Sequence, residues 1–79
     1  MKRVQFEVPE DRVDQMDKLQ STLGLSTRKQ LLNNALAILK WAVDQRQLGR
    51  KVASIDEQEN SYNELVMPSL QHVPVQSDR

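Results

Sequence analysis

The chain has 79 residues, a mass of 9.1 kDa and a net charge of zero, with no cysteine and one histidine, His72. This length excludes a multidomain enzyme, and the composition excludes disulfide frameworks, thiolate metal sites and a zinc site built on histidine and cysteine. No apolar run reaches the roughly 20 residues of a membrane span and no signal-peptide pattern opens the chain, so we expect a soluble, cytoplasmic protein.

Polar and apolar residues alternate over residues 3–8, which predicts a short amino-terminal β-strand. The apolar face of this strand would hold Val4, Phe6 and Val8, and the polar face Arg3, Gln5 and Glu7. Pro9 lacks the N–H group that a strand needs, so the strand should end there.

Two helices are expected next, over residues 10–23 and 27–48. In the first, Val13, Met16, Leu19 and Leu23 recur at helical spacing, and Gly24 ends the helix. Ser26 or Thr27 can cap the second helix, and residues 27–30 match a capping box. Apolar residues cover more than one stripe of this second helix, which predicts packing on two sides, with Trp41 in the core or a dimer interface.

The remaining residues form an acidic extension, 50–79, after a first domain over 1–49. Two β-prone runs, 51–55 and 62–67, flank a polar stretch, which is consistent with a hairpin within 51–67 or with an open, extended tail. The last eight or so residues have few apolar side chains, and we expect them to be mobile.

A lone strand leaves both edges unpaired, and a second copy can supply the missing partner. We therefore expect a mainly α protein with one amino-terminal strand, forming an intertwined homodimer around a two-stranded antiparallel ribbon. Such a ribbon fits the DNA major groove, where arginine can bond guanine, glutamine adenine and glutamate cytosine. The expected base-contacting residues are Arg3, Gln5 and Glu7.

The start of the second helix offers N–H groups and cations to phosphates beside that groove. The expected phosphate-contacting residues are Lys2, Ser26, Thr27, Arg28 and Lys29. Each group also has a simpler interpretation: the polar strand face as a solvated surface, the two hydroxyl residues as caps, and the cations as ordinary surface charges.

Residues 2–48 resemble the ribbon-helix-helix DNA-binding proteins of the MetJ, Arc and CopG type. The segment from Lys2 to Glu10 is similar to the family's strand and its exit into the first helix, and Leu23-Gly24-Leu25-Ser26 is similar to the turn between the helices. The resemblance implies an obligate dimer whose outward strand residues contact bases, while the start of the second helix contacts phosphates.

Our leading hypothesis is a homodimeric, sequence-specific DNA-binding repressor, without enzymatic activity, cofactor or metal. Residues 1–51 carry ten Lys or Arg against six Asp or Glu, a net charge of +4, which suits binding to double-stranded DNA. His72 has no neighbouring nucleophile or ligand cluster in the sequence, so we assign it no role.

Two alternatives stay open. Residues 52–79 carry a net charge of −4 and could bind a basic protein partner through residues 50–70, as many relatives in the family, the antitoxins, do. The apolar anchors would then be Val52, Ile55, Tyr62, Leu65 and Met67. In the third interpretation, the dimer is a structural or assembly protein that does not bind DNA.

Overall fold

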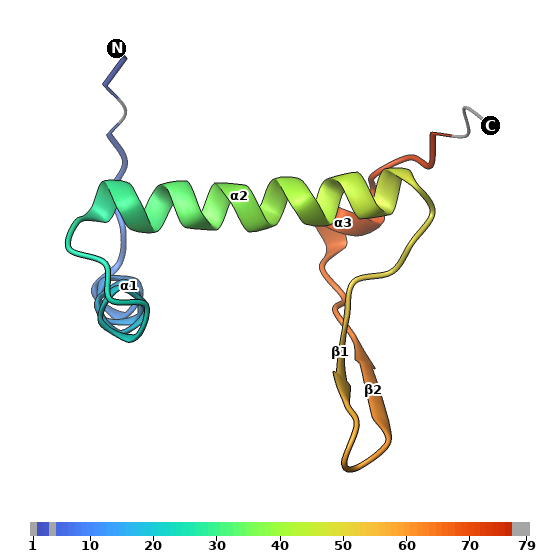
Figure 1. Ribbon diagram of the computed structural model, residues 1–79. Helices are drawn as coiled ribbons and strands as arrows, with labels where there is room; N and C mark the ends of the chain where they lie inside the picture. Colours follow the sequence, from blue (N-terminus) through green and yellow to red (C-terminus); the bar gives the residue numbers. More distant parts are fainter. Residues whose placement is uncertain (1, 4, 77–79) are drawn as a thin grey trace. The chain divides into compact units, whose positions relative to one another are not determined.

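The computed structural model describes residues 2, 3 and 5–76 of the chain. The elements follow the order α1, α2, β1, β2, α3 (Figure 1). The chain divides into two compact units, Met1–Ala35 and Leu36–Arg79, and the boundary falls within helix α2.

The two predicted helices are confirmed: α1 begins at the expected residue, and the other three ends lie one residue from those expected. Helix α1 covers Glu10–Thr22 and helix α2 covers Arg28–Gln47. Both helices end in the same way, with a glycine of positive φ followed by a residue whose N–H bonds back to the last turn. At the end of α1, Gly24 has φ +69° and Leu25 N donates to Gln20 O at 2.9 Å. At the end of α2, Gly49 has φ +79° and Arg50 N donates to Gln45 O at 2.9 Å.

The predicted capping box at the start of α2 is also confirmed. Thr27 Oγ1 accepts a hydrogen bond from Gln30 N at 3.1 Å, and Gln30 Oε1 accepts one from Thr27 N at 3.3 Å. Ser26 supports the same turn, because its N–H and its hydroxyl both donate to Gln30 Oε1, at 2.8 and 3.1 Å. These bonds satisfy N–H groups that have no partner inside the helix.

The predicted amino-terminal strand is wrong. Among residues 2, 3 and 5–9 none belongs to a strand, and the two-stranded antiparallel sheet of the chain follows the helices instead (Figure 1). A strand requires a neighbour for its N–H and C=O groups, and the described part of the chain offers none to this segment. The expected ribbon-helix-helix architecture, with an intertwined ribbon of amino-terminal strands, is therefore wrong. Val4, which was expected on the apolar face of the strand, lies outside the described residues.

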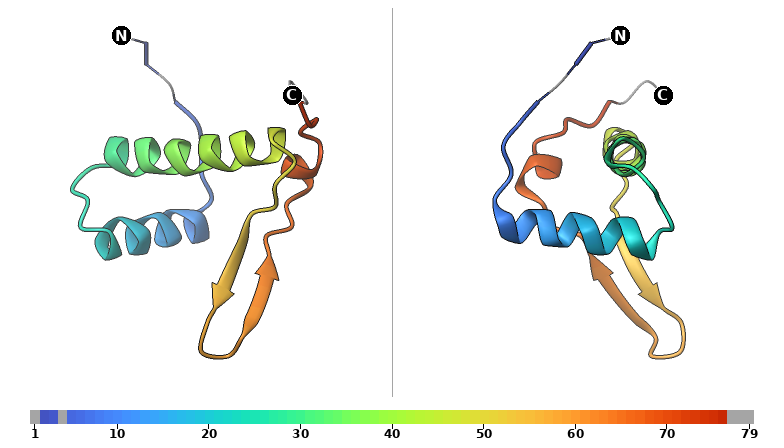
Figure 2. Two further views of the ribbon diagram at one scale, coloured as in Figure 1. Left: turned by 45° about the vertical axis from the view of Figure 1, so that its right-hand side comes forward. Right: turned by 90° about the vertical axis from the view of Figure 1, so that its left-hand side faces the viewer.

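The sheet is a hairpin of β1, Ala53–Asp56, and β2, Ser61–Glu64, so the structure has the hairpin and not the open tail (Figure 2). Asp56 Oδ1 accepts hydrogen bonds from the N–H groups of Gln58 and Glu59, at 3.1 and 3.2 Å, which fixes the turn. Asn60 completes the loop with φ +53°, a conformation that asparagine tolerates better than most residues.

A short helix, α3, covers Pro68–Gln71 and packs in the second unit. Its Leu70 is buried, and Arg46 Nη2 of α2 donates to Gln71 Oε1 at 3.4 Å. Further on, Gln76 N donates to Gln47 O at 2.8 Å, which links the segment after α3 to the end of α2.

Few apolar side chains are buried. The buried apolar residues of the described part are Leu31, Ala42 and Leu70. None of the helices in this part of the chain combines the length and the apolar character needed to cross a lipid bilayer.

Candidate functional site

An open apolar groove lies in the first unit, between the amino-terminal segment, α1 and the first turns of α2. Its apolar lining comes from all three segments and consists of Phe6, Val8, Val13, Met16, Leu19, Leu31, Leu32 and Ala35. Apart from Leu31, none of these side chains is buried, and Phe6 is 64% exposed. The groove is therefore an apolar surface that the described part of the chain does not cover.

Polar side chains share the lining of this groove, and most of them belong to the predicted DNA site. They are Lys2, Gln5, Glu7, Arg28, Lys29 and Asn33. The fold thus brings five of the eight predicted site residues to one place, although they come from segments about 20 residues apart in the sequence. The sequence predicted that Gln5 and Glu7 lie on the opposite side of the amino-terminal segment from Phe6 and Val8. The structure does not show this separation, because all four residues line the same groove.

The other three predicted residues do not line the groove. Arg3 is exposed on the amino-terminal segment, while Ser26 and Thr27 belong to the capping box of α2. The Thr27 hydroxyl oxygen already accepts a hydrogen bond from Gln30 N, so its role as a cap is realised in the structure.

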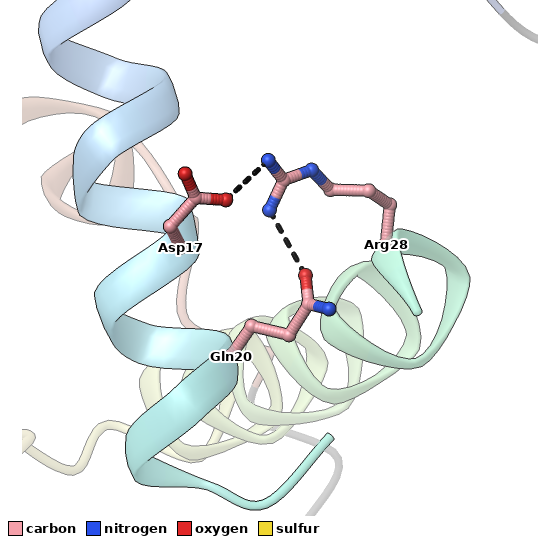
Figure 3. A network of polar contacts seen from close by, with 3 residues as sticks. All are labelled: Asp17, Gln20 and Arg28. Atoms are coloured by element: carbon pink, nitrogen blue, oxygen red, sulfur yellow. Dashed lines mark hydrogen bonds and ion pairs between the residues drawn. The ribbon is translucent and has the colours of Figure 1, made fainter. Parts of the chain in front are cut away.

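Arg28 is held by helix α1 (Figure 3). Its Nη2 lies 2.5 Å from Asp17 Oδ1 and its Nη1 donates to Gln20 Oε1 at 2.9 Å. The side chains of Arg28 and Asp17 are 46% and 59% exposed, so the pair lies at the surface. Because the Asp17 carboxylate offsets the charge of Arg28, Lys2 and Lys29 are the cations of the groove without an ion pair among the described residues.

Asp17 and Gln20 were not among the functional residues predicted from the sequence. They lie three residues apart on α1, so a helix places them on one face, where a single guanidinium can reach both. The sequence shows the spacing of Asp17 and Gln20. It does not show that Arg28 contacts both, because that contact depends on the path of the turn between α1 and α2.

Helix α2 presents apolar residues around most of its circumference. Leu32, Leu36 and Leu39 form one stripe, while Ile38 and Trp41 lie on another side of the helix, and all five are exposed. A helix with apolar side chains on so many sides is ordinarily buried. Here only Leu31 and Ala42 of the helix are buried, so most of this surface has no cover within the described part of the chain.

The part of the chain that the structure describes holds no group of three or more His, Cys, Asp or Glu side chains placed to bind a metal ion. Comparisons with protein-family models, with curated proteins and with solved structures find no match to this chain.

Proposed function

We propose that the protein is a homodimer that binds double-stranded DNA and regulates transcription. The observation that carries the proposal is the convergence of Lys2, Gln5, Glu7, Arg28 and Lys29 on one groove. Cations bind phosphates without regard to sequence, whereas amide and carboxylate side chains can distinguish base edges. A surface that offers both kinds of group has the chemistry that DNA recognition requires.

The exposed apolar surface supports the proposed dimer. The groove lining and the sides of α2 together expose more apolar side chains than a monomer of this size normally leaves in water. A second copy can cover them, because in a twofold interface the same patch meets itself. The polar side chains of the lining are all exposed, and in this proposal they remain in water beside the covered apolar residues and meet the DNA.

In this proposal, Arg3, Gln5 and Glu7 contact bases, and Lys2, Ser26, Thr27, Arg28 and Lys29 lie against phosphates. Lys29 contributes more than Arg28 to phosphate binding, because Asp17 already pairs with Arg28. Phosphate contacts release counterions, so the affinity of the protein for DNA falls as the salt concentration rises.

Fluorescence anisotropy tests the proposal with two duplexes, the DNA upstream of the protein's own gene and a scrambled sequence, at two salt concentrations. The upstream duplex is expected to bind more tightly, with a difference that persists at the higher salt concentration. Equal binding of the two duplexes at both salt concentrations would contradict sequence-specific recognition.

Two variants separate the roles of the residues. Arg3→Ala should weaken binding of the upstream duplex alone by about 1–3 kcal/mol, whereas Lys29→Ala should weaken both duplexes and lower the salt dependence by about one unit. Lys18→Ala is the matched control, because Lys18 is an exposed cation of α1 outside the groove. A loss for Lys18→Ala equal to that of Lys29→Ala would show that only the total charge matters.

A further inference from the structure

One face of the β1–β2 hairpin carries Ala53, Ile55 and Tyr62, with Glu64 opposite Ala53, and its two large apolar side chains are exposed. Ile55 lies opposite Tyr62 in the register, and these two side chains are 71% and 59% exposed. Leu65 N donates to Val52 O at 2.7 Å, so the alternation of the ladder makes Ile55 and Tyr62 a non-hydrogen-bonded pair, whose side chains lie close together. The other face of the hairpin carries only polar side chains, those of Ser54, Asp56, Ser61 and Asn63.

The two ends of this hairpin carry opposite charges. The loop end holds three acids, Asp56, Glu57 and Glu59, and no Lys or Arg, and Glu57 and Glu59 form no ion pair among the described residues. At the other end, Arg50 and Lys51 precede β1 and are exposed. Lys51 Nζ lies 3.7 Å from Glu64 Oε1, and the Lys51 side chain is 61% exposed, so this end of the hairpin holds two cations and one acid.

The opposite charges are placed symmetrically along the hairpin. Lys51 lies three residues before Ser54, and Glu57 lies three residues after it. At about 3.3 Å per residue, each of them is roughly 10 Å from the level of Ser54. A second hairpin turned by 180° about an axis at that level therefore has its acidic loop beside the basic end of the first.

We propose that this hairpin is a contact surface for a second copy of the chain, in which two hairpins pack face to face and antiparallel. Because Ile55 and Tyr62 lie one residue from the axis, they pack diagonally beside the same pair of the other copy and over its Ala53 and Glu64. Glu57 and Glu59 of each copy lie beside Arg50 and Lys51 of the other. A two-stranded hairpin is at best marginally stable in water, so a cover for its apolar face stabilises the hairpin itself.

A second copy fits this surface better than the other occupants. DNA is repelled by the acidic loop. A basic protein would suit the loop but would place like charge beside Arg50 and Lys51, whereas a second copy complements both ends at once. The face is small, so the contact is weak alone and adds to other contacts between copies. The inference does not depend on DNA binding.

Site-directed cross-linking tests this contact, because the chain has no cysteine of its own. Ala53 shares the apolar face with Ile55, and Ala53→Cys places a thiol there. A bismaleimide with a span of about 10 Å, the separation of two packed sheets, is expected to join two copies of this variant. The matched control is Ser54→Cys on the polar face of the same strand, which should cross-link several-fold less.

Charge reversal in the Ala53→Cys background identifies the contact. A loop variant, Glu57→Lys with Glu59→Lys, and a base variant, Arg50→Glu with Lys51→Glu, should each cross-link poorly alone, because like charges meet at both ends. An equal mixture of the two variants should recover the yield, since both ends then carry opposite charges.

The proposal is overturned if Ala53→Cys and Ser54→Cys cross-link equally, if neither cross-links, or if the mixture fails to recover the yield. A failure of DNA binding would leave the cross-linking result unchanged, so the two proposals are tested separately. Circular dichroism of each variant checks that the helices are intact.

Discussion

The guanidinium group of Arg28, in the first turn of α2, lies 2.5 Å from the carboxylate of Asp17 in the middle of α1. Gln20 Oε1 accepts a hydrogen bond from the second nitrogen of the same guanidinium at 2.9 Å, so one side chain of α2 bonds to two residues of α1 (Figure 3). This contact links the two helices beyond the short turn that joins them. It also turns a cation expected to bind phosphate into part of the helix–helix contact.

Removal of Asp17 should cost little stability, since the ion pair is exposed. Asp17→Ala is expected to lower the free energy of unfolding by at most about 1 kcal/mol, the usual range for surface pairs. Urea denaturation at a fixed protein concentration measures this change, and a double-mutant cycle with Arg28→Ala isolates the coupling between the two side chains. The matched control is Asp14→Ala, an exposed acid of α1 that has no ion pair among the described residues. A coupling energy of zero would contradict a role for the pair in holding the helices together.

Thr27 should matter to stability through its cap. Thr27→Ala is expected to lower the free energy of unfolding by about 1 kcal/mol, because Gln30 N loses its acceptor, while Thr27→Ser keeps the hydroxyl and most of the stability. Thermal denaturation followed by circular dichroism measures both variants. Ser26→Ala is the control, since the Ser26 hydroxyl donates to a side chain and caps no N–H group. Equal losses for Ser26→Ala and Thr27→Ala would argue against the capping box.

Gly24 should tolerate few replacements, although there is open space around it. A Cβ at this position meets no atom within 4 Å, so a loss of stability must come from the backbone, whose φ is +69°. Gly24→Ala is expected to cost about 1–2 kcal/mol, the price of a left-handed conformation for an L-residue. Gly24→Asn should cost less, because asparagine visits this region more readily. Denaturant unfolding of the two variants measures the difference, and a larger loss for Gly24→Asn would contradict the backbone explanation.

The features predicted correctly from the sequence are local. The helices, the capping box and the glycine ends depend on residues within one or two turns of each other, so spacing alone identifies them. The amino-terminal strand was predicted from alternation, which describes side-chain faces but cannot supply the neighbouring strand that hydrogen bonding needs. The hairpin could be offered only as one of two alternatives, because its register depends on pairing across the loop.

The candidate site shows the same limit. Alternation suggested that Gln5 and Glu7 face away from Phe6, yet all three line one groove with α1 and α2. The pairing of Arg28 with Asp17 was not predicted either, since it depends on the path of the turn between the helices. Residue chemistry identified the cations, whereas only the fold determines which of them already has a partner.

The exposed stripe of α2 gives the most direct test of the dimer. Leu36 belongs to that stripe and is 54% exposed, whereas the neighbouring Ala37 lies on the polar side of the helix with Asn33 and Lys40. Leu36→Glu is expected to dissociate the dimer, because it would bury an unpaired carboxylate in the interface. Ala37→Glu adds the same charge on the polar side and should leave the dimer intact. Sedimentation equilibrium should therefore give a mass of 9.1 kDa for Leu36→Glu and twice that for Ala37→Glu. If both variants sediment as the unmodified chain does, the stripe is not the interface; if the unmodified chain itself sediments as a single copy, the homodimer is wrong.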